Sequence, residues 1–320
     1  MRHTIIKTIY SKNIGLGHLN AMVFLTNRSP KNLTTFTFVI NNEIDAIRYL
    51  KQHKKKILID ENFKMNDHLI DQNCDVAIYY FPLDQFFIKK KRHFKTIFIS
   101  NSLKKVKSNA DVVILGPDKQ VEYKYKKNFY TGPKYSIFEH SNYKYKHQEN
   151  IKNCLVCLGG TDKSDNIIKV IKALEYLNLK INYSFFLRSS MVSKDISILI
   201  KQNNNKTFKF IFDKKSLSSY LPSFHFGIIS GGNILYQMCS SHIPTLVLPQ
   251  SKEENLMAKR LQKQKCTIVS KSNFENWNQT TFCRQLMKYI YQNDRRKVVT
   301  QSCKKYFGNK NLNEVYKLIK

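Results

Sequence analysis

Residues 3–27 read HTIIKTIYSKNIGLGHLNAMVFLTN, and this stretch decides the fold. Residues 3–10 are rich in β-branched and apolar side chains, as expected for a buried strand. A loop with two glycines follows, and residues 18–27 then show the apolar spacing of a helix. A strand, a glycine loop and a helix in this order are typical of the start of a Rossmann-like α/β unit.

The alternation of strands and helices continues along the chain. In the first half we expect further strands at residues 34–40, 55–60, 75–80, 95–100 and 111–115, and a helix at 43–53. A polar, basic segment at 139–153 interrupts the pattern. The pattern then restarts with strands at 154–160, 181–187, 208–212, 226–230, 244–249 and 266–270, helices at 166–177, 233–241 and 253–264, and a mostly helical region at 282–320.

Strands separated by helices form parallel sheets that are covered on both faces. We therefore predict an α/β fold with two Rossmann-type domains facing a central cleft. Residues 1–140 would form the N-terminal Rossmann-like domain, and residues 141–152 the linker. Residues 153–320 would form the C-terminal nucleotide-binding Rossmann-like domain together with the C-terminal helices. Ligands of such sheets bind beyond the carboxyl ends of the strands.

The composition bounds the class of protein. The apolar fraction is 42%, which is typical of a globular protein. No apolar run approaches the ~18 residues that span a bilayer, and the first residues lack the pattern of a signal peptide. These features predict a cytoplasmic location.

The net charge of +31 would suit nucleic acid, an anionic membrane or an acidic substrate. Only nine of the 54 basic residues are arginine, and the charge is spread along the chain. Because no nucleic-acid-binding signature is present, we expect no specific nucleic-acid partner. At most, we expect weak peripheral association with an anionic membrane through residues 88–95 and 123–127. A solvated surface is the alternative interpretation of both segments.

Cys154 and Cys157 form the one C-x-x-C pair among the seven cysteines. Such a pair is found in zinc and redox sites. Residues three apart in a strand point to opposite faces, however, and no second pair exists to complete a metal site. We predict packed core thiols and no metal site.

The first glycine loop contains Gly15 and Gly17 and leads into His18 at the start of a helix. A helix start that follows a strand is the context of an anion-binding loop. The positive end of the helix opposes protonation, so we expect a neutral imidazole near pH 7 that can accept a proton. A capping or packed histidine is the alternative.

The second loop, CLGGTDKSD at residues 157–165, again follows an expected strand. Gly159 and Gly160 permit a tight turn. Asp162 is placed either to cap the following helix or to hold a sugar hydroxyl.

The third loop, ISGGNILYQ at residues 229–237, repeats the order of strand, glycine pair and helix. Gly231, Gly232 and Asn233 would present backbone N–H groups to a diphosphate at the helix N-terminus. Gln237 lies one turn later, within reach of a ribose or sugar hydroxyl. No D-x-D, G-x-S-x-G or H-E-x-x-H motif is present, which disfavours several other enzyme classes.

Three stretches together resemble a known family: IGLGH (14–18), CLGGTD (157–162) and IISGGNILYQMCSSHIPTLVLP (228–249). They are similar to the PseG/SpsG family. This family comprises the UDP-sugar hydrolases of pseudaminic acid biosynthesis within the broader spore-coat polysaccharide group, and it is related to the MurG-type glycosyltransferases of the GT-B fold. The resemblance runs from about residue 4 to residue 264.

The resemblance implies roles for particular residues. His18 corresponds to the proposed catalytic histidine of the family, and the loop at Gly231 corresponds to the part that binds UDP. Gln237 aligns with a ribose-binding glutamate. Asp60 is a smaller match after the third strand. The family requires no metal, and we expect no cofactor.

Two further residues, Glu253 and Glu254, align with an Asn-Gln pair that precedes a helix in the family. We include them among the expected substrate-binding residues.

The implied partner is a UDP-sugar. The implied reaction is attack of water on the anomeric carbon of a UDP-linked diacetamido-trideoxy sugar, which releases free sugar and UDP with inversion. Two alternatives remain open. One is a GT-B glycosyltransferase that uses a UDP- or CMP-sugar, and the other is a nucleotide-sugar-binding protein without catalysis.

Overall fold

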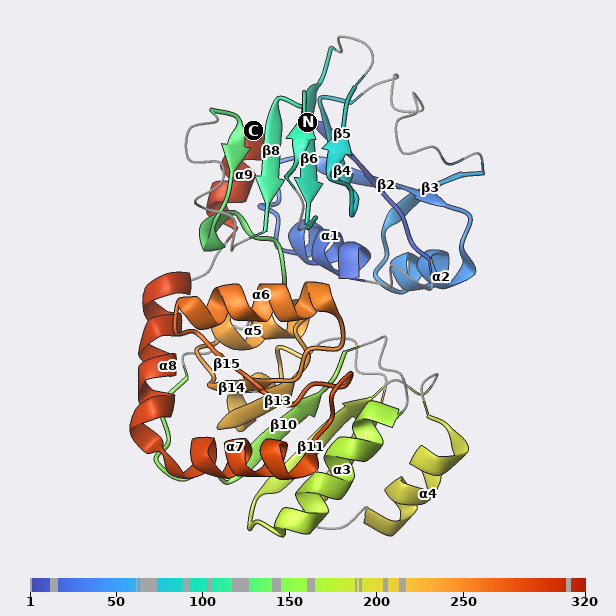
Figure 1. The fold of residues 1–320 in the computed structure, drawn as a ribbon. Coiled ribbons are helices and arrows are strands. Elements are labelled where there is room, and N and C mark those ends of the chain that lie inside the picture. The colour runs from blue at the N-terminus through green and yellow to red at the C-terminus, as the bar shows by residue number, and fades with distance from the viewer. Residues whose placement is uncertain are drawn as a thin grey trace. The chain divides into compact units, whose positions relative to one another are not determined.

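The structure is a computed structural model that describes residues 2–11, 17–61, 63, 74–88, 93–102, 105–116, 127–139, 145–159, 165–187, 189, 192–203, 207–212, 217–308 and 312–320. The chain divides into two compact units (Figure 1). The first unit comprises Met1–Glu139 and Lys310–Lys320, and the second comprises His140–Asn309.

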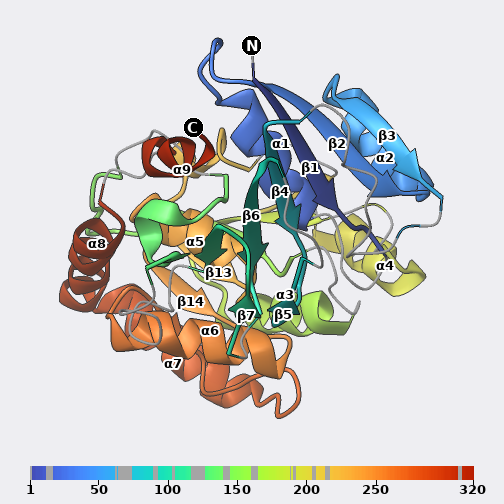
Figure 2. The ribbon, with the colours of Figure 1, turned by 90° about the horizontal axis from the view of Figure 1, so that it is seen from above.

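The first unit contains a parallel sheet of seven strands in the order β3-β2-β1-β4-β6-β8-β9. Figure 2 shows β3, β2, β1, β4 and β6 in this order. The strands are β1 (His3–Thr8), β2 (Thr35–Asn41), β3 (Lys56–Asp60), β4 (Val76–Tyr80), β6 (Lys95–Ser100), β8 (Val112–Leu115) and β9 (Phe129–Tyr130). Nearly continuous apolar runs such as VAIYY in β4 form buried central strands, because both faces of a parallel sheet are covered.

Helices in the described part of the first unit are α1 (Gly17–Asn27), α2 (Ile44–Gln52) and α9 (Asn313–Ile319), with the short 3₁₀ helix η1 (Pro133–Tyr135). Side chains of the three α-helices join one apolar core with β1, β2, β4, β6 and β8. A second core cluster contains Phe81, Phe86, Phe94 and Phe98. Phe86 belongs to a separate two-stranded sheet formed by β5 (Gln85–Phe86) and β7 (Lys107–Ser108).

The sequence analysis expected strands and helices to alternate along the chain, and part of the first unit departs from this alternation. In the described residues between β4 and β8, short strands and loops rich in phenylalanine supply the buried side chains. The expected strands at residues 75–80, 95–100 and 111–115 are present as β4, β6 and β8. Two-residue strands such as β5 and β7 are too short to show a periodic pattern.

The second unit contains a parallel sheet of six strands in the order β12-β11-β10-β13-β14-β15. This order is that of the doubly wound dinucleotide-binding fold, in which the strand order reverses next to the first strand. The strands are β10 (Asn153–Cys157), β11 (Asn182–Leu187), β12 (Phe208–Phe212), β13 (Phe226–Ile229), β14 (Thr245–Val247) and β15 (Ile268–Val269).

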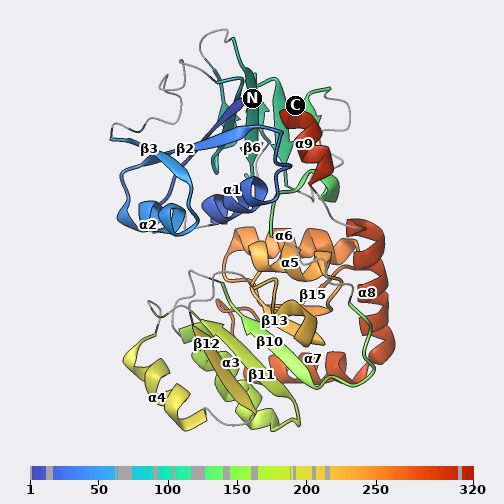
Figure 3. The ribbon, with the colours of Figure 1, turned by 180° about the vertical axis from the view of Figure 1, so that it is seen from behind.

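Figures 1 and 3 show the helices of the described second unit, in which α7 contacts both α3 and α8. The helix α3 contacts α4 and α7, whereas α5 contacts β13, β14 and α8. Their bounds are α3 (Asp165–Leu177), α4 (Lys194–Asn203), α5 (Asn233–Ser240), α6 (Lys252–Lys263), α7 (Gln279–Tyr291) and α8 (Asn293–Phe307), with the 3₁₀ helix η3 (Leu221–Ser223). None of the helices in the described ranges has the length and apolar character that crossing a membrane requires.

The domain boundaries differ from the expected ones at both ends of the second unit. Residues 145–152, expected to belong to a linker, group with the second unit. The buried guanidinium of Arg296 on α8 explains this, because it donates hydrogen bonds to the carbonyl oxygens of Gln148 and Glu149.

The last helix was expected in the C-terminal domain, and instead belongs to the first unit. Val315, Tyr316 and Ile319 of α9 are buried in the first-unit core. The Tyr316 hydroxyl donates a hydrogen bond of 2.8 Å to the carbonyl of Leu25 on α1. An amphipathic pattern shows that a helix has an apolar face, but not which core covers that face.

Candidate functional site

His18 lies at the point where the strand order of the first sheet reverses. It is the second residue of α1, which follows β1, and the neighbouring strand in the sheet is β4. The imidazole meets the ring of Tyr80, the last residue of β4, edge-on with ring centroids 4.4 Å apart. Ligands of open α/β sheets bind at such a reversal point.

The imidazole of His18 is buried, with 9% of the residue exposed. Neither ring nitrogen has a hydrogen-bond partner among the described residues. Burial lowers the pKa of His18 from 6.5 to about 4, so the ring is neutral near pH 7. The sequence analysis expected a neutral ring because of the helix dipole, whereas desolvation is the cause that the structure identifies. A buried polar group with no partner is uncommon and needs an explanation, such as a ligand that supplies the missing hydrogen bond.

Asp60 has a structural contact that the sequence analysis did not anticipate. It ends β3, and its carboxylate oxygen lies 3.4 Å from the ammonium nitrogen of Lys7 in β1. Both side chains are almost fully buried, and the ammonium group also lies over the ring of Phe63, 4.8 Å from its centroid. The carboxylate therefore compensates a buried charge, since burying either ion alone would be costly.

The turns after β10 and β13 meet at the corresponding reversal point of the second sheet. The N–H of Ser230 donates to the carbonyl of Cys157, at 3.1 Å. Gly159 has a positive φ of 89°, which favours glycine. The Ser230 hydroxyl lies 3.2 Å from the position that a Cβ on Gly159 would take, and 3.9 Å from that on Gly232.

The carboxylate of Glu254 occupies the turn between β13 and α5. One of its oxygens, Oε2, accepts hydrogen bonds from the N–H of Gly231 at 3.1 Å and from the N–H of Gln250 at 2.8 Å. The other oxygen lies 3.2 Å from the position of a Cβ on Gly232. Glu254 is the third residue of α6, and its own N–H donates to the Ser251 hydroxyl that caps this helix. The structure thus brings three expected site residues together.

The other expected site residues are distributed as follows. Gly17 is the first residue of α1. Asn233 is exposed at the start of α5, and Gln237 is half-buried one turn later. Glu253 is exposed on α6. Gly15, Gly160 and Asp162 lie outside the described residues.

Ser230 and Gln250 are two residues of this region that the sequence analysis missed. Ser230 is 1% exposed, and its hydroxyl has no hydrogen-bond partner among the described residues. The Gln250 side-chain amide donates to the carbonyl of Leu158, which ties the end of β14 to that of β10. Each residue follows the carboxyl end of a strand, and this position is the signal that could have identified them.

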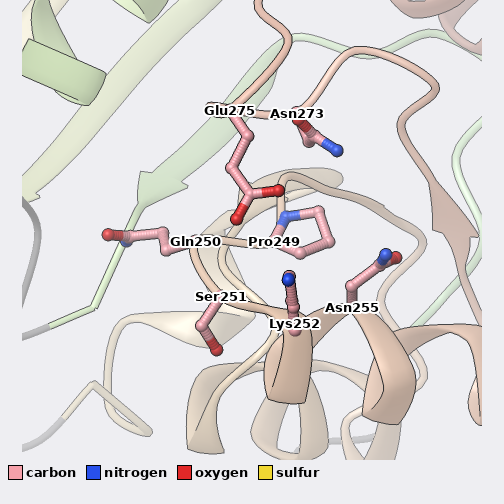
Figure 4. Close-up of a pocket in the computed structure, with 7 residues that line it drawn as sticks. All are labelled: Pro249, Gln250, Ser251, Lys252, Asn255, Asn273 and Glu275. Atoms are coloured by element: carbon pink, nitrogen blue, oxygen red, sulfur yellow. The ribbon is translucent and has the colours of Figure 1, made fainter.

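A small hollow lies beside the start of α6 (Figure 4). Asn273 and Glu275 line it from the segment after β15, and Ser251, Lys252 and Asn255 from α6 and its cap. Pro249 and Gln250 complete the lining. Most of these side chains carry hydrogen-bonding groups, as the hydroxyls of a sugar require.

The cysteines of the C-x-x-C pair differ in environment. Cys154 is buried in β10, and burial raises the pKa of its thiol, whereas Cys157 is half-buried. The described residues contain no group of three or more His, Cys, Asp or Glu side chains that could hold a metal ion.

Comparisons with known proteins identify the fold. No protein-family model matches the sequence. The crystal structure of Acinetobacter baumannii MurG superimposes with a TM-score of 0.66 over 99% of both chains, at 9% sequence identity. The spinosyn rhamnosyltransferase SpnG complexed with thymidine diphosphate superimposes with a TM-score of 0.63 over 97% of this chain and 96% of that chain, at 11% identity. The predicted fold class is therefore confirmed: the chain has the GT-B fold of glycosyltransferases.

Two curated proteins are similar in sequence. An uncharacterized protein of Methanocaldococcus jannaschii, MJ1062, is 23% identical over 263 residues, which are 76% of this chain and 54% of that protein. The spore coat polysaccharide biosynthesis protein SpsG of Bacillus subtilis is 26% identical over 135 residues, which are 41% of this chain and 40% of that protein. The matched regions thus span about half the length of these relatives or less.

Proposed function

We propose that this chain is an enzyme that acts on a nucleotide sugar, and that it hydrolyses a UDP-linked sugar to free sugar and UDP. The observation that carries the proposal is His18. It is a buried, neutral imidazole whose two nitrogens are unpaired in the described part of the chain, at the reversal point of an α/β sheet. Such a group is suited to accept a proton from a substrate hydroxyl or from water.

The second unit supports the nucleotide part of the proposal. The turn between β13 and α5 already binds a carboxylate through the N–H of Gly231, so it is competent to bind an anion. Backbone N–H groups at the start of a helix stabilise phosphate groups in the same way. SpnG, which shares the fold, has been crystallised with thymidine diphosphate. The similarity to SpsG favours a role in making a surface polysaccharide or glycan sugar.

In the proposed reaction, water attacks the anomeric carbon and gives its proton to His18. The bond between this carbon and the phosphate oxygen breaks, and UDP leaves with the electron pair. Backbone N–H donors at a helix start stabilise the charge on a departing diphosphate. The pKa of about 4 for His18 is low for a base. The negative charge of a bound substrate raises it, because nearby negative charge favours the imidazolium form.

A glycosyltransferase is the second candidate function. The solved structures that match this chain over nearly its whole length include glycosyltransferases. The chemistry at His18 would then be the same except that an acceptor hydroxyl replaces water. The hollow beside α6 and the turn before α5 do not discriminate between the two reactions.

The test is incubation with a panel of UDP- and CMP-sugars, with and without polysaccharide acceptors. We expect free sugar and nucleotide to form without any acceptor. The variant His18→Gln should lower turnover by about 100-fold or more, which is the usual contribution of a general base. His93→Gln, at an exposed position in the same unit, is the matched control and should retain full turnover.

Three outcomes would contradict parts of the proposal. Turnover that requires an acceptor identifies a transferase instead of a hydrolase. Unchanged turnover of His18→Gln removes His18 from the mechanism. Calorimetric binding of UDP without turnover of any sugar of the panel shows a binding protein without catalysis.

A further inference from the structure

The carboxylate of Glu254 occupies the position in which the proposed function places a phosphate group. It accepts the N–H of Gly231 and the N–H of Gln250 with the same oxygen, at 3.1 and 2.8 Å. Two backbone donors that converge on one oxygen are what a phosphate oxygen would use at the start of a helix. Gly232 is the N-cap of α5, and no side chain of the described residues forms a capping hydrogen bond there. The protein therefore supplies its own anion to this turn.

Glu254 holds this position at an energetic cost. Burial raises the pKa of its carboxyl group, and the hydrogen bonds from Gln250 and Gly231 offset only part of that effect. No Lys, Arg or His side chain forms an ion pair with Glu254 among the described residues. A carboxylate held by backbone donors alone has no positively charged side chain beside it to offset its charge when another anion approaches.

The backbone around Glu254 is fixed, so only its side chain is free to leave. A Cβ on Gly231 would lie 2.6 Å from the backbone oxygen of Glu254 and 2.7 Å from its Cβ. The first turn of α6 is thus packed directly onto Gly231. Displacement of the carboxylate requires rotation about the side-chain bonds of Glu254 and no movement of α6.

Ser230 provides an independent indication that this turn accepts a ligand. Its hydroxyl is buried and has no partner in the described part of the chain, and it lies between Gly159 and Gly232. The Glu254 carboxylate does not hydrogen-bond this hydroxyl among the described contacts. A buried hydroxyl without a partner is unfavourable, and a phosphate oxygen that accepted its hydrogen bond would remove this cost.

We propose that Glu254 is the residue that determines how strongly this site binds phosphate: it is an internal anion that a phosphate group of the nucleotide has to displace. This inference rests on the proposed function, since it concerns the same nucleotide site. The negative charge of Glu254 lowers the affinity of the site for the phosphate groups of a nucleotide. It does not change the contacts that the nucleoside makes. The charge at position 254, and not the shape of the side chain, is the decisive property.

The experiment compares the wild-type chain with Glu254→Gln and Glu254→Ala in calorimetric titrations with UDP and with uridine. Glutamine keeps an acceptor for Gly231 and Gln250 and removes the charge. We expect both variants to bind UDP at least about tenfold more tightly than the wild type, because a like charge within hydrogen-bonding range is removed. Uridine should bind equally to all three proteins. Thermal unfolding of each variant establishes that it is folded.

The matched control is Glu175→Gln, which removes the same charge from an exposed position on α3 of the same unit. It should bind UDP as the wild type does. An equal gain in this control would mean that net charge, and not Glu254, limits binding, and would overturn the inference.

The remaining outcomes separate the inference from the proposed function. If wild type and both Glu254 variants bind UDP equally, the inference fails and the proposed function stands. If Glu254→Gln binds UDP less tightly, Glu254 assists the nucleotide and the inference is wrong. If no variant binds UDP or any nucleotide of the sugar panel, both the inference and the proposed function fail.

Discussion

At the scale of single residues, the buried imidazole of His18 couples the stability of the first unit to pH. The pKa is about 4 in the folded protein and near 6.5 in an unfolded chain. Between these values the unfolded state binds more protons, so folding becomes less favourable as the pH falls below about 6.5, and the loss is complete below about pH 4. The pKa difference corresponds to about 3 kcal/mol.

We predict that this loss disappears in His18→Gln, which has no titrating group at that position. The measurement is hydrogen exchange of the amides of β1 and β4 between about pH 7 and pH 4, corrected for the intrinsic exchange rate. His93→Gln should keep the wild-type dependence. Parallel curves for the wild type and His18→Gln would show that the imidazole is hydrated or paired in solution.

His18 and Asp60 show which properties of a site residue can be predicted from the sequence and which cannot. A neutral His18 was expected from its place at a helix start, whereas the cause in the structure is burial. Its burial against Tyr80 was not predictable, because Tyr80 lies some sixty residues further along the chain. Asp60 was expected to bind substrate, and this stays a prediction; its pairing with Lys7 was not foreseen. Contacts between residues distant in sequence depend on the strand order, which a single sequence does not specify.

At the scale of secondary-structure elements, Gly231 sets the distance between the turn after β13 and the first turn of α6. We predict that Gly231→Ala destabilises the second unit by about 2 kcal/mol, because the new Cβ would overlap backbone atoms of Glu254 that cannot move separately from α6. Gly232→Ala is the matched control. Its nearest contact is the end of the flexible Glu254 side chain at 3.2 Å, so its cost should stay below about 1 kcal/mol.

The measurement is the exchange of amides in β13, β14 and α6, which reports on the second unit alone. Equal destabilisation by the two substitutions would mean that α6 shifts freely, and the argument for a fixed backbone around Glu254 would then be wrong.

Elements with a long, regular pattern were predictable from the sequence. The strand at residues 56–60 and the helix at residues 44–52 lie within one or two residues of their expected bounds. The two-residue strands β5, β7 and β9 were not predicted, since a period of two needs at least four residues to be visible. In the same way, the glycine pair predicted the turn before α5. It did not predict that the carboxylate of Glu254, twenty-three positions after Gly231, would occupy this turn.

At the scale of the whole molecule, the assignment of the last helix to the first unit is the main feature that the sequence could not specify. The alternating pattern restarts after residue 153, and everything beyond it was therefore assigned to one domain. Two units that each bury helices on a parallel sheet offer equivalent apolar surfaces to an amphipathic helix. Only the contacts of α9 with α1 and η1 show that it packs in the first unit.

These contacts predict that deletion of residues 309–320 destabilises the first unit selectively. The deletion exposes the core around α1 that Leu312, Val315, Tyr316 and Ile319 cover, and it removes the hydrogen bond from Tyr316 to Leu25. Exposing this apolar surface should cost on the order of 5 kcal/mol, comparable with the whole stability of a small domain. Hydrogen exchange should accelerate in β1, β2 and α1 while β10, β13 and β14 keep their protection. Lys317→Ala, at an exposed position on α9, should change neither unit. Faster exchange in the second unit alone would place α9 in the core of that unit. This would agree with the sequence analysis, which assigned residues 153–320 to one domain.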